Sequence, residues 1–224
     1  LFEEFGKSLV IEPYLSNIVL AGSVLDKSNF EGKVELIEGI CSGSMHVSLA
    51  YAEAAHSYEY LKPDTNVSDD NKLNGTKTLV LNGKNASKII VSCVRNGELS
   101  LVLVDKTAEG ISFNTFKTID EKTCAEFTFE NVSIQDSDVI ASGDEAKNIL
   151  IETINLATLC ISAEAVGCMV SCYNKTVQYT KEREQFDQPI SNFQVLQHRM
   201  VDMFIDSELA KSLLFKAMLE VDAD

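Results

Sequence analysis

Residues 179–194 read Tyr-Thr-Lys-Glu-Arg-Glu-Gln-Phe-Asp-Gln-Pro-Ile-Ser-Asn-Phe-Gln, a polar stretch that joins two apolar helical patterns. Before it, apolar residues recur without a proline from Ala146 to Tyr179, which predicts one long helix that is apolar on nearly every side. After it, a second helical pattern carries apolar residues on one face: Leu196, Met200, Met203 and Phe204. The sequence therefore predicts a helical hairpin whose polar corner carries Arg183.

The first of these helices is long for a small monomeric core. At roughly 1.5 Å per residue it would extend over about 50 Å. A helix that is apolar on nearly every side must lie between other helices. We therefore expect a helical bundle that is shared between subunits, as a dimer or a dimer of dimers.

Composition limits the kinds of partner that the chain can have. The 224 residues are 45% hydrophobic and 24% charged, which is ordinary for a soluble globular protein, and the formal net charge is −15. This charge argues against a general nucleic-acid or anionic-membrane surface. No uncharged apolar span reaches membrane length, so membrane insertion is not expected. The cysteines lack the spacing of a zinc or thioredoxin-type site and favour buried free thiols in a reducing cytosol: Cys41, Cys93, Cys124, Cys160, Cys168 and Cys172.

The first two thirds of the chain change from a helical to a strand pattern. Helical stretches interrupted at Pro13, and a short helix from Lys33 to Cys41 that stops at Gly43, resemble the end of a helical domain. The following residues predict short strands in a small antiparallel barrel or sandwich, with Asn96-Gly97 as a hairpin turn: 76–81, 87–94, 99–104 and the alternating 125–129. Residues 63–74, rich in Asp and Asn, predict a surface loop. The fold class is thus α+β, with domains 1–45, 46–142 and 143–224.

The run from Tyr179 to Met203 resembles the carboxy-terminal signature of the flavin-dependent acyl-CoA dehydrogenases. The resemblance extends over essentially the whole chain and implies FAD as the cofactor. The chain begins at Leu1 without a methionine and stops at Asp224 within a helical pattern, so we interpret it as a fragment that lacks both ends.

The resemblance also implies which residues lie at the flavin. The motif arginine and the residue two positions later contact the adenosine diphosphate part of a flavin bound mainly by a neighbouring subunit; these are Arg183 and Gln185, with Phe193 and Gln194 near the same cofactor. The family's usual glycine after the phenylalanine is Asp187 here, and aspartate accepts a positive φ less readily than glycine.

Two of these residues have a plainer interpretation. Arg183 stands between Glu182 and Glu184 and is alternatively a solvated charge at the end of the helix, which contributes little to stability. Gln194 follows Ser191 at the spacing of a capping box, so its amide alternatively satisfies the first donors of the second helix.

In the middle domain the resemblance places Tyr51, Ala52, Leu79 and Leu81 at the flavin. The family usually has a threonine or serine at the positions of Ala52 and Leu81, and a tryptophan at that of Leu79. Its glycine-serine-aspartate sequence is Ser57-Tyr58-Glu59 here. Backbone donors and apolar side chains would then replace the usual side-chain hydrogen bonds to the flavin.

No catalytic residue is identified. In most relatives the catalytic glutamate lies beyond the arginine motif, past the end of this chain. In a minority it lies early in the long helix, at the position of Ala157, next to an arginine whose position is Thr158 here. Asn155 and Thr158 are the substrate-binding candidates, and the nearest carboxylates, Glu152 and Glu164, are expected to be helix-face charges because a general base must reach the substrate.

The resemblance implies α,β-dehydrogenation of an acyl-CoA with hydride transfer to FAD, reoxidation by an electron-transfer flavoprotein, and a cytoplasmic role in fatty acid metabolism. Residues 158–167 and 73–83 look most like the branch of pimeloyl-CoA dehydrogenase small subunits. The alternative function is therefore a non-catalytic partner subunit of a hetero-oligomeric acyl-CoA dehydrogenase with a degenerate flavin site. We expect this chain by itself to be inactive.

Overall fold

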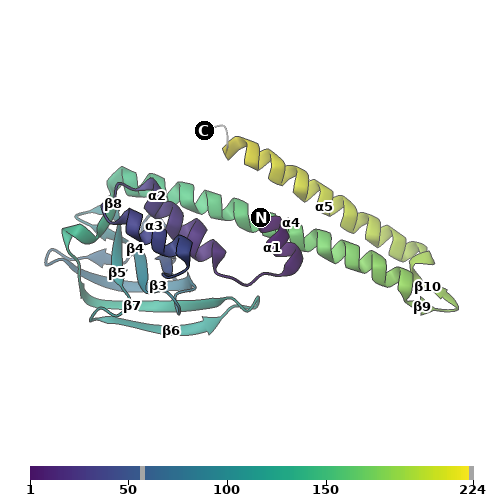
Figure 1. Cartoon of the computed structure of the whole chain (residues 1–224), viewed down its shortest axis with the longest axis horizontal. Helices are drawn as coiled ribbons and strands as arrows, with labels where there is room; N and C mark the ends of the chain where they lie inside the picture. Colours follow the sequence, from purple (N-terminus) through teal and green to yellow (C-terminus); the bar gives the residue numbers. More distant parts are fainter. Residues whose placement is uncertain (56–58, 222–224) are drawn as a thin grey trace. The chain divides into compact units, whose positions relative to one another are not determined.

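A computed structural model of the protein describes residues 1–55 and 59–221. The chain forms two compact units (Figure 1). One comprises Ile11–Ala157, and the other comprises Leu1–Val10 together with Thr158–Asp224. Helix α4, Gly143–Glu182, contributes residues to both units.

The Ile11–Ala157 unit is built on a sheet with the strand order β6-β7-β3-β2-β4-β5-β8, to which β1 adds by pairing with β4. Its strands are β1 Val47–Ala50, β2 Asn66–Val67, β3 Lys72–Leu81, β4 Lys88–Arg95, β5 Glu98–Asp105, β6 Ile111–Lys117, β7 Thr123–Ser133 and β8 Val139–Ser142. Most neighbours are antiparallel, as the sequence predicts, but β1 and β2 both run parallel to β4. The sheet is therefore mixed, which corrects the purely antiparallel expectation.

The strand predictions with the clearest pattern are confirmed. In β7 the side chains of Ala125, Phe127 and Phe129 are buried, whereas Glu130 is exposed. The β4–β5 hairpin turns at Asn96-Gly97, where both residues adopt a positive φ (53° and 81°). That pair of angles matches the twist of the flanking strands and explains why this dipeptide is a strong hairpin signal.

The surface-loop prediction for residues 63–74 is wrong. The segment contains β2 and the start of β3, which pair with each other through Val67 and Leu73. Both of these side chains are buried, and Leu73 is completely so. The Asp and Asn residues between them form only the turn, with Asn71 at a φ of 55°. Two isolated apolar residues among polar ones were too few to reveal the strand pattern.

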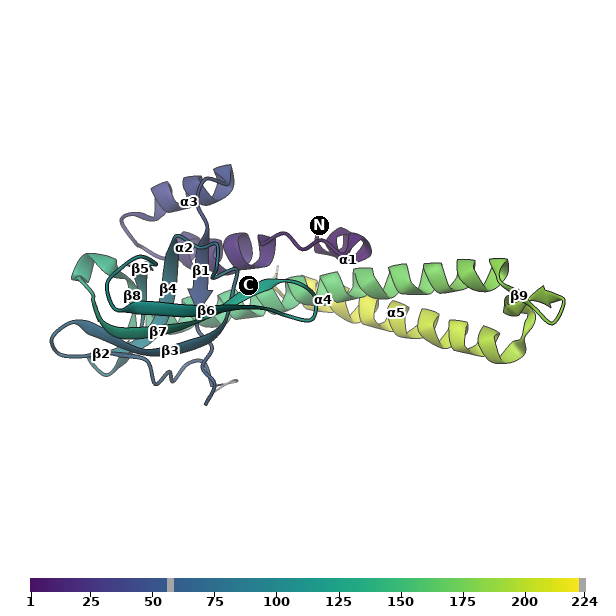
Figure 2. The same ribbon diagram turned by 90° about the horizontal axis from the view of Figure 1, so that it is seen from below.

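Helices cover one face of this sheet (Figure 2). A π-helix, η1 Leu15–Gly22, continues into α2 Ser23–Lys27, and α3 Lys33–Ser42 follows. Helix α3 ends at Gly43, whose φ of 74° confirms the predicted stop. Their apolar side chains share one core with the sheet and the start of α4: Leu20, Val24, Leu25, Leu36, Ile40, Leu49, Ile90, Leu101, Ile149 and Leu150. A second core, centred on Phe127 and Phe129, lies within the strands.

The other unit contains the predicted helical hairpin. The long helix forms as α4, and α5 Gln194–Val221 returns alongside it in Figures 1 and 2. Between them lie β9 Glu184–Gln185, β10 Gln188–Pro189 and the 3-10 turn η3 Ile190–Asn192. Tyr173 packs on Phe204 with ring centroids 5.6 Å apart, and the Thr180 hydroxyl lies 3.3 Å from the Met200 sulfur. Helix α1, Phe2–Ser8, belongs to the same unit.

The capping-box alternative for the last helix is wrong. Helix α5 begins at Gln194, so the residue before it is Phe193, and Ser191 lies in the separate turn η3. The carbonyl oxygen of Ser191 instead accepts a hydrogen bond from the Gln197 side chain across 3.0 Å. Gln194 is thus available for another role.

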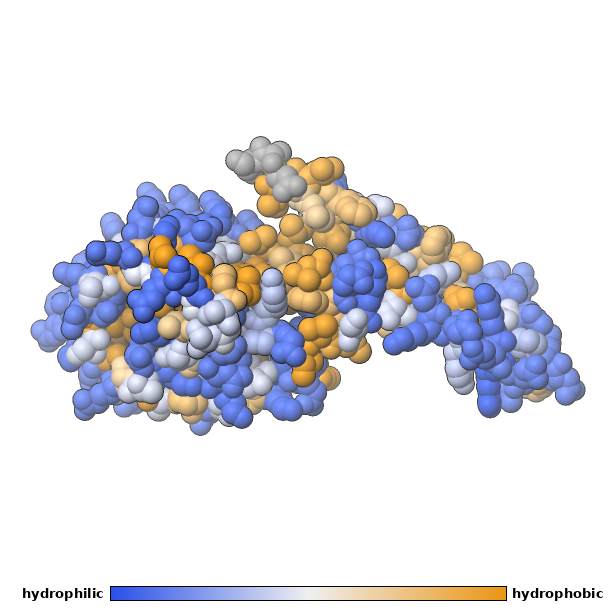
Figure 3. Space-filling view, in the orientation of Figure 1, coloured by the Kyte–Doolittle hydropathy of each residue, from blue (hydrophilic) through white to orange (hydrophobic). Residues whose placement is uncertain are grey.

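Two helices expose large apolar surfaces. By length and composition alone α4 could cross a membrane, although Glu152, Glu164 and Lys175 divide it so that no uncharged span has that length. On α5 exposed apolar side chains occur along the whole helix, and Figure 3 shows a hydrophobic patch in its C-terminal half, where they are Leu209 64%, Leu213 68%, Phe215 52%, Met218 42%, Leu219 72% and Val221 50% exposed.

Candidate functional site: the hairpin tip and the β3 bulge

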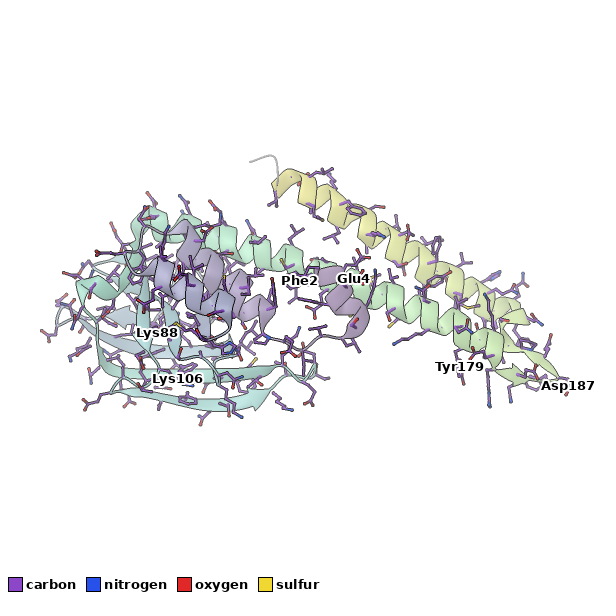
Figure 4. All side chains as sticks on the ribbon, viewed as in Figure 1. Phe2, Glu4, Lys88, Lys106, Tyr179 and Asp187 are labelled. Carbon is purple, nitrogen blue, oxygen red and sulfur yellow. The ribbon has the colours of Figure 1, made fainter. Side chains whose placement is uncertain are left out.

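The tip of the helical hairpin is a tight turn between β9 and β10. Gln188 pairs with Gln185, so Phe186 and Asp187 are the two turn residues, and both have positive φ values (56° and 62°). This is the geometry of a type I′ turn. Asp187 therefore adopts the left-handed conformation that the family's glycine would take, and Figure 4 shows it at the end of the hairpin.

The four predicted residues of the carboxy-terminal half come together at this tip. The Arg183 amide donates to the Tyr179 carbonyl (2.9 Å), and the Arg183 carbonyl accepts from the Ile190 amide (2.8 Å). Phe186 and Phe193 meet edge to face with centroids 6.0 Å apart, and Phe186 is 85% exposed. The side chains of Arg183, Gln185 and Gln194 are exposed as well.

The Arg183 guanidinium makes no ion pair or side-chain hydrogen bond with any residue of 1–55 or 59–221. Arg183 is thus an exposed charge at the end of α4, as its plainer interpretation also expects. An exposed guanidinium that is held by a rigid turn can bind a phosphate with paired charge-assisted hydrogen bonds. The side-chain amide of Gln185, whose Nε2 donates to the Glu184 carbonyl (2.8 Å), adds a polar group beside the Arg183 guanidinium.

The four predicted residues of the middle domain also come together. The Thr78 amide donates to the Ala52 carbonyl across 2.9 Å, and the Ser48 hydroxyl donates to the Leu81 carbonyl across 2.9 Å. These two bonds hold the segment after β1, with Tyr51 and Ala52, against the end of β3. The predicted positions are therefore neighbours in space.

Strand β3 has a bulge at this point. Lys77 pairs with Phe127 and Val80 pairs with Ala125, so Thr78 and Leu79 together oppose a single residue of β7. Leu79 has a φ of 50° and is 56% exposed, which is unusual for a bulky apolar residue. A bulge re-aims a side chain, and here it turns a leucine outward.

A buried ion pair lies directly behind the bulge. The Lys77 ammonium, which is completely buried, donates to Glu53 Oε1 (2.7 Å) and to the Ser92 hydroxyl (3.0 Å). The Glu53 carboxylate also accepts from the Thr65 hydroxyl (2.6 Å) and from the amides of Thr65 (3.1 Å) and Asp64 (2.7 Å). Both charges are therefore well bonded, as buried charges must be.

The environment shifts both pKa values. Desolvation lowers the pKa of Lys77, and the interaction with Glu53 opposes this shift only in part. Burial by itself would raise the pKa of Glu53, but the hydrogen bonds from Lys77 and Thr65 outweigh it and the pKa is lowered. We conclude that Glu53 is ionised near neutral pH.

This ion pair was not predicted from the sequence. The sequence nevertheless contains a pattern that indicates it. Leu73 and Lys77 are four residues apart in one strand, so they share a face, and Leu73 faces the core. A lysine on a core-facing position indicates a buried acidic partner.

The substrate-binding candidates lie on the outer part of α4. The side chains of Asn155 and Thr158 are exposed, whereas Ala157 packs against the helix-covered core. Glu152 and Glu164 are the carboxylates nearest to Ala157 in the sequence. The Glu152 carboxylate accepts a hydrogen bond from the Lys27 ammonium across 2.5 Å. Since Glu152 is held by this ion pair, it is a poor candidate for a displaced base. Ser57 and Tyr58 lie outside the described residues.

The residues present fit the two ends of FAD differently. At the hairpin tip, the guanidinium of Arg183 and the Gln185 amide suit a diphosphate group. At the bulge, Tyr51, Leu79 and Leu81 offer apolar surface that suits a flat ring, while Ala52 and Leu81 supply no side-chain donor. Each place by itself therefore fits one part of a flavin, and at the bulge only backbone groups are available as hydrogen-bonding partners.

A mixed sheet followed by a long antiparallel helical hairpin with an arginine at its tip defines a two-part α+β class of protein. Family comparison names that class: the acyl-CoA dehydrogenase middle domain matches residues 48–132, and the acyl-CoA dehydrogenase C-terminal domain matches residues 148–224. Together these matches cover more than half of the chain. The protein belongs to the acyl-CoA dehydrogenase family.

Individual relatives agree with this assignment. An isovaleryl-CoA dehydrogenase from Solanum tuberosum is 28% identical over 162 residues, which cover 67% of this chain and 39% of that protein. The butyryl-CoA dehydrogenase of Megasphaera elsdenii superposes with a TM-score of 0.88 at 20% identity, over 100% of this chain and 62% of that one. A chain of the ChsE4–ChsE5 complex from Mycobacterium tuberculosis superposes with a TM-score of 0.85 at 22% identity, over 99% of this chain and 60% of that one. These two structures establish the fold. The chain spans about two fifths of the length of the curated relatives that it matches.

Proposed function

We propose that this chain is a flavoprotein subunit that takes part in the α,β-dehydrogenation of an acyl-CoA thioester. The observation that carries the proposal is the hairpin tip, where Arg183 is exposed and unpaired within the described residues and the Phe186-Asp187 turn keeps the left-handed conformation. Dehydrogenase activity is established for the family, and its assignment to this chain is our proposal.

The chemistry divides between the cofactor and the protein. When bound, FAD accepts the β hydride of the acyl chain, and an electron-transfer flavoprotein then takes the electrons. The α proton must leave to a base of the protein. Arg183 and Gln185 would bind the diphosphate of a flavin held mainly by a neighbouring subunit, and the Leu79 bulge would pack against the ring of the flavin held by this chain. Asn155 and Thr158 would face the acyl-CoA.

A second function is favoured by specific observations. Ala52, Leu79 and Leu81 supply no side-chain hydrogen bond to a flavin ring, and the position of a possible early base is Ala157. Such a chain would serve as a non-catalytic subunit that completes the flavin or substrate site of a paralogue, as the resemblance to pimeloyl-CoA dehydrogenase small subunits implies. One fold neighbour is part of a complex of two named chains, ChsE4 and ChsE5. The hetero-oligomeric assembly of this chain remains our proposal, as do its cytoplasmic location and its role in fatty acid metabolism.

The visible absorption spectrum distinguishes these functions. The protein is purified alone and with a paralogue encoded nearby, and the bound flavin is quantified. Arg183→Ala should weaken FAD binding by about tenfold to a hundredfold, as expected for the loss of charge-assisted hydrogen bonds. Lys181→Ala, which removes an exposed cation from the last turn of α4, is the matched control and should leave FAD binding unchanged.

Two results would contradict the proposal. Equal FAD content in the wild type and in Arg183→Ala would refute the role of the hairpin tip. No FAD in either preparation, with or without the paralogue, would refute the flavoprotein assignment. FAD that appears only with the paralogue would favour the non-catalytic subunit.

A further inference from the structure

The buried pair Lys77–Glu53 joins the two segments that form the ring-side surface. Lys77 is the last regularly paired residue of β3 before the bulge that carries Leu79. Glu53 follows Tyr51 and Ala52 directly in the chain. The 2.7 Å contact between their charged groups therefore links the β3 bulge to the segment after β1 from the buried side.

A backbone bond closes the same link on the next residues. The Thr78 amide, adjacent to Lys77, donates to the Ala52 carbonyl, adjacent to Glu53 (2.9 Å). The side-chain contact Lys77–Glu53 and the backbone contact Thr78–Ala52 thus hold β3 and the segment after β1 together at two neighbouring residues of each. The Lys77 ammonium also lies 3.5 Å from the Tyr51 carbonyl, so it contacts Tyr51 as well as Glu53.

The bulge needs such support because its conformation is unfavourable by itself. A leucine at a φ of 50° is strained, and strained residues persist only when their surroundings determine them. Leu79 is 56% exposed, so its own side chain packs too little to hold that conformation. The restraint must therefore come from the flanking residues, of which Lys77 is completely buried and Val80 is 1% exposed.

Stability alone does not require a charged pair at this place. Replacing a buried ion pair by apolar residues of similar volume is often neutral or stabilising, whereas removing one partner is strongly destabilising. The hydrogen bonds of Glu53 to Thr65 and Asp64 give the pair a geometry that apolar residues would lack. This difference points to a positioning role.

We propose that Lys77 and Glu53 are positioning residues that set the conformation of the Leu79 bulge and of the Tyr51–Ala52 segment, and thereby the surface against which the flavin ring packs. The last clause rests on the proposed function. The first part concerns this chain alone and does not depend on a cofactor.

The double variant Glu53→Leu/Lys77→Met separates positioning from stability. Its melting temperature should fall, because the Thr65 hydroxyl and the amides of Thr65 and Asp64 lose their acceptor, but it should fall less than in Lys77→Met alone, which leaves the Glu53 charge buried and unpaired. Exchange of the Thr78 amide hydrogen should become at least about tenfold faster, because its bond to Ala52 loses its support. In the FAD-loaded protein, the visible circular dichroism of the flavin should fall and FAD should bind about tenfold more weakly.

Ser92→Ala is the matched control. It removes the 3.0 Å bond to the Lys77 ammonium but leaves the ion pair intact, so Thr78 exchange and flavin dichroism should both stay near the wild-type values. Should the double variant not fold, Glu53→Gln/Lys77→Met keeps an acceptor oxygen for the Thr65 and Asp64 donors and leaves no buried charge. In this variant too, Thr78 exchange should become faster and the flavin dichroism should fall, but both changes should be smaller.

The outcomes are distinguishable. Wild-type values of Thr78 exchange and flavin dichroism in a folded double variant would overturn the positioning role. Faster Thr78 exchange in a double variant, with no FAD bound even by the wild type, would support positioning of the bulge and refute the proposed flavin function instead.

Discussion

Gly6 of α1 lies so close to α4 that a Cβ atom at this position would be 1.9 Å from the carbonyl oxygen of Glu164. The contact is reciprocal, since a Cβ at Gly167 would be 2.0 Å from the carbonyl oxygen of Glu3. The Cys168 thiol also donates to the Gly6 carbonyl across 3.2 Å. Backbone meets backbone here, so no side chain can move to make room.

Gly6→Ala and Gly167→Ala should therefore each destabilise the α1–α4 contact, with a loss of about 1–3 kcal/mol in the free energy of unfolding, as expected for overpacking. Chemical denaturation followed by far-ultraviolet circular dichroism would measure it. The control is Gly22→Ala, where the nearest atom would be 3.5 Å away, so that replacement should be neutral or stabilising. Equal stability of all three variants would show that the two helices do not pack this closely.

The sequence predicted those parts of the fold that have a long or regular pattern. The helix now seen as α4, the alternation in β7, the Asn96-Gly97 turn and the polar hairpin corner all follow from local periodicity and turn chemistry. The domain ranges 1–45, 46–142 and 143–224 stay predictions.

The parts that sequence reasoning missed depend on tertiary contacts. Strand β2 has two residues, and its pairing with β4 joins segments far apart in the chain. The bulge at Leu79 requires a positive φ at a residue that normally avoids it, so no local signal announces it. The resemblance identified Leu79 as a candidate flavin neighbour, but not the buried Lys77–Glu53 pair behind it.

The Lys77–Glu53 pair should make stability depend on pH. The pKa of Glu53 is lowered from its ordinary value of 4.5, so its contribution is present above that value and is lost as the pH falls toward the folded-state pKa. Below about pH 4.5 the melting temperature of the wild type should therefore fall more steeply than that of Glu53→Leu/Lys77→Met. A difference that stays constant from pH 7 to pH 3 would show that Glu53 titrates normally in the folded protein.

The exposed apolar face of α5 should be covered in solution by a second copy or by a paralogue. Leu209 and Leu213 lie one helical turn apart and are 64% and 68% exposed, which is more apolar surface than a monomer usually leaves in water. Leu213→Glu should dissociate the assembly, because a carboxylate without a partner is costly to bury. Sedimentation velocity at micromolar concentration measures the change, with Lys216→Glu on the same helix as the control. A monomeric wild type would contradict this prediction.

This chain without a paralogue should not dehydrogenate acyl-CoA, even when FAD is bound. A positioned base contributes about 10²- to 10⁴-fold to the rate of proton transfer. Ala157 cannot supply it, and the Glu152 carboxylate is held by Lys27. Without a group to take the α proton, the β hydride has no productive route to the flavin. Anaerobic mixing of the FAD-loaded protein with a medium- or long-chain acyl-CoA should therefore leave the flavin absorption unbleached, while dithionite bleaches it and confirms that the flavin is reducible. Rapid bleaching by acyl-CoA without any partner protein would show that the chain has a base of its own, and Glu164→Gln would then be the first variant to compare with Glu152→Gln.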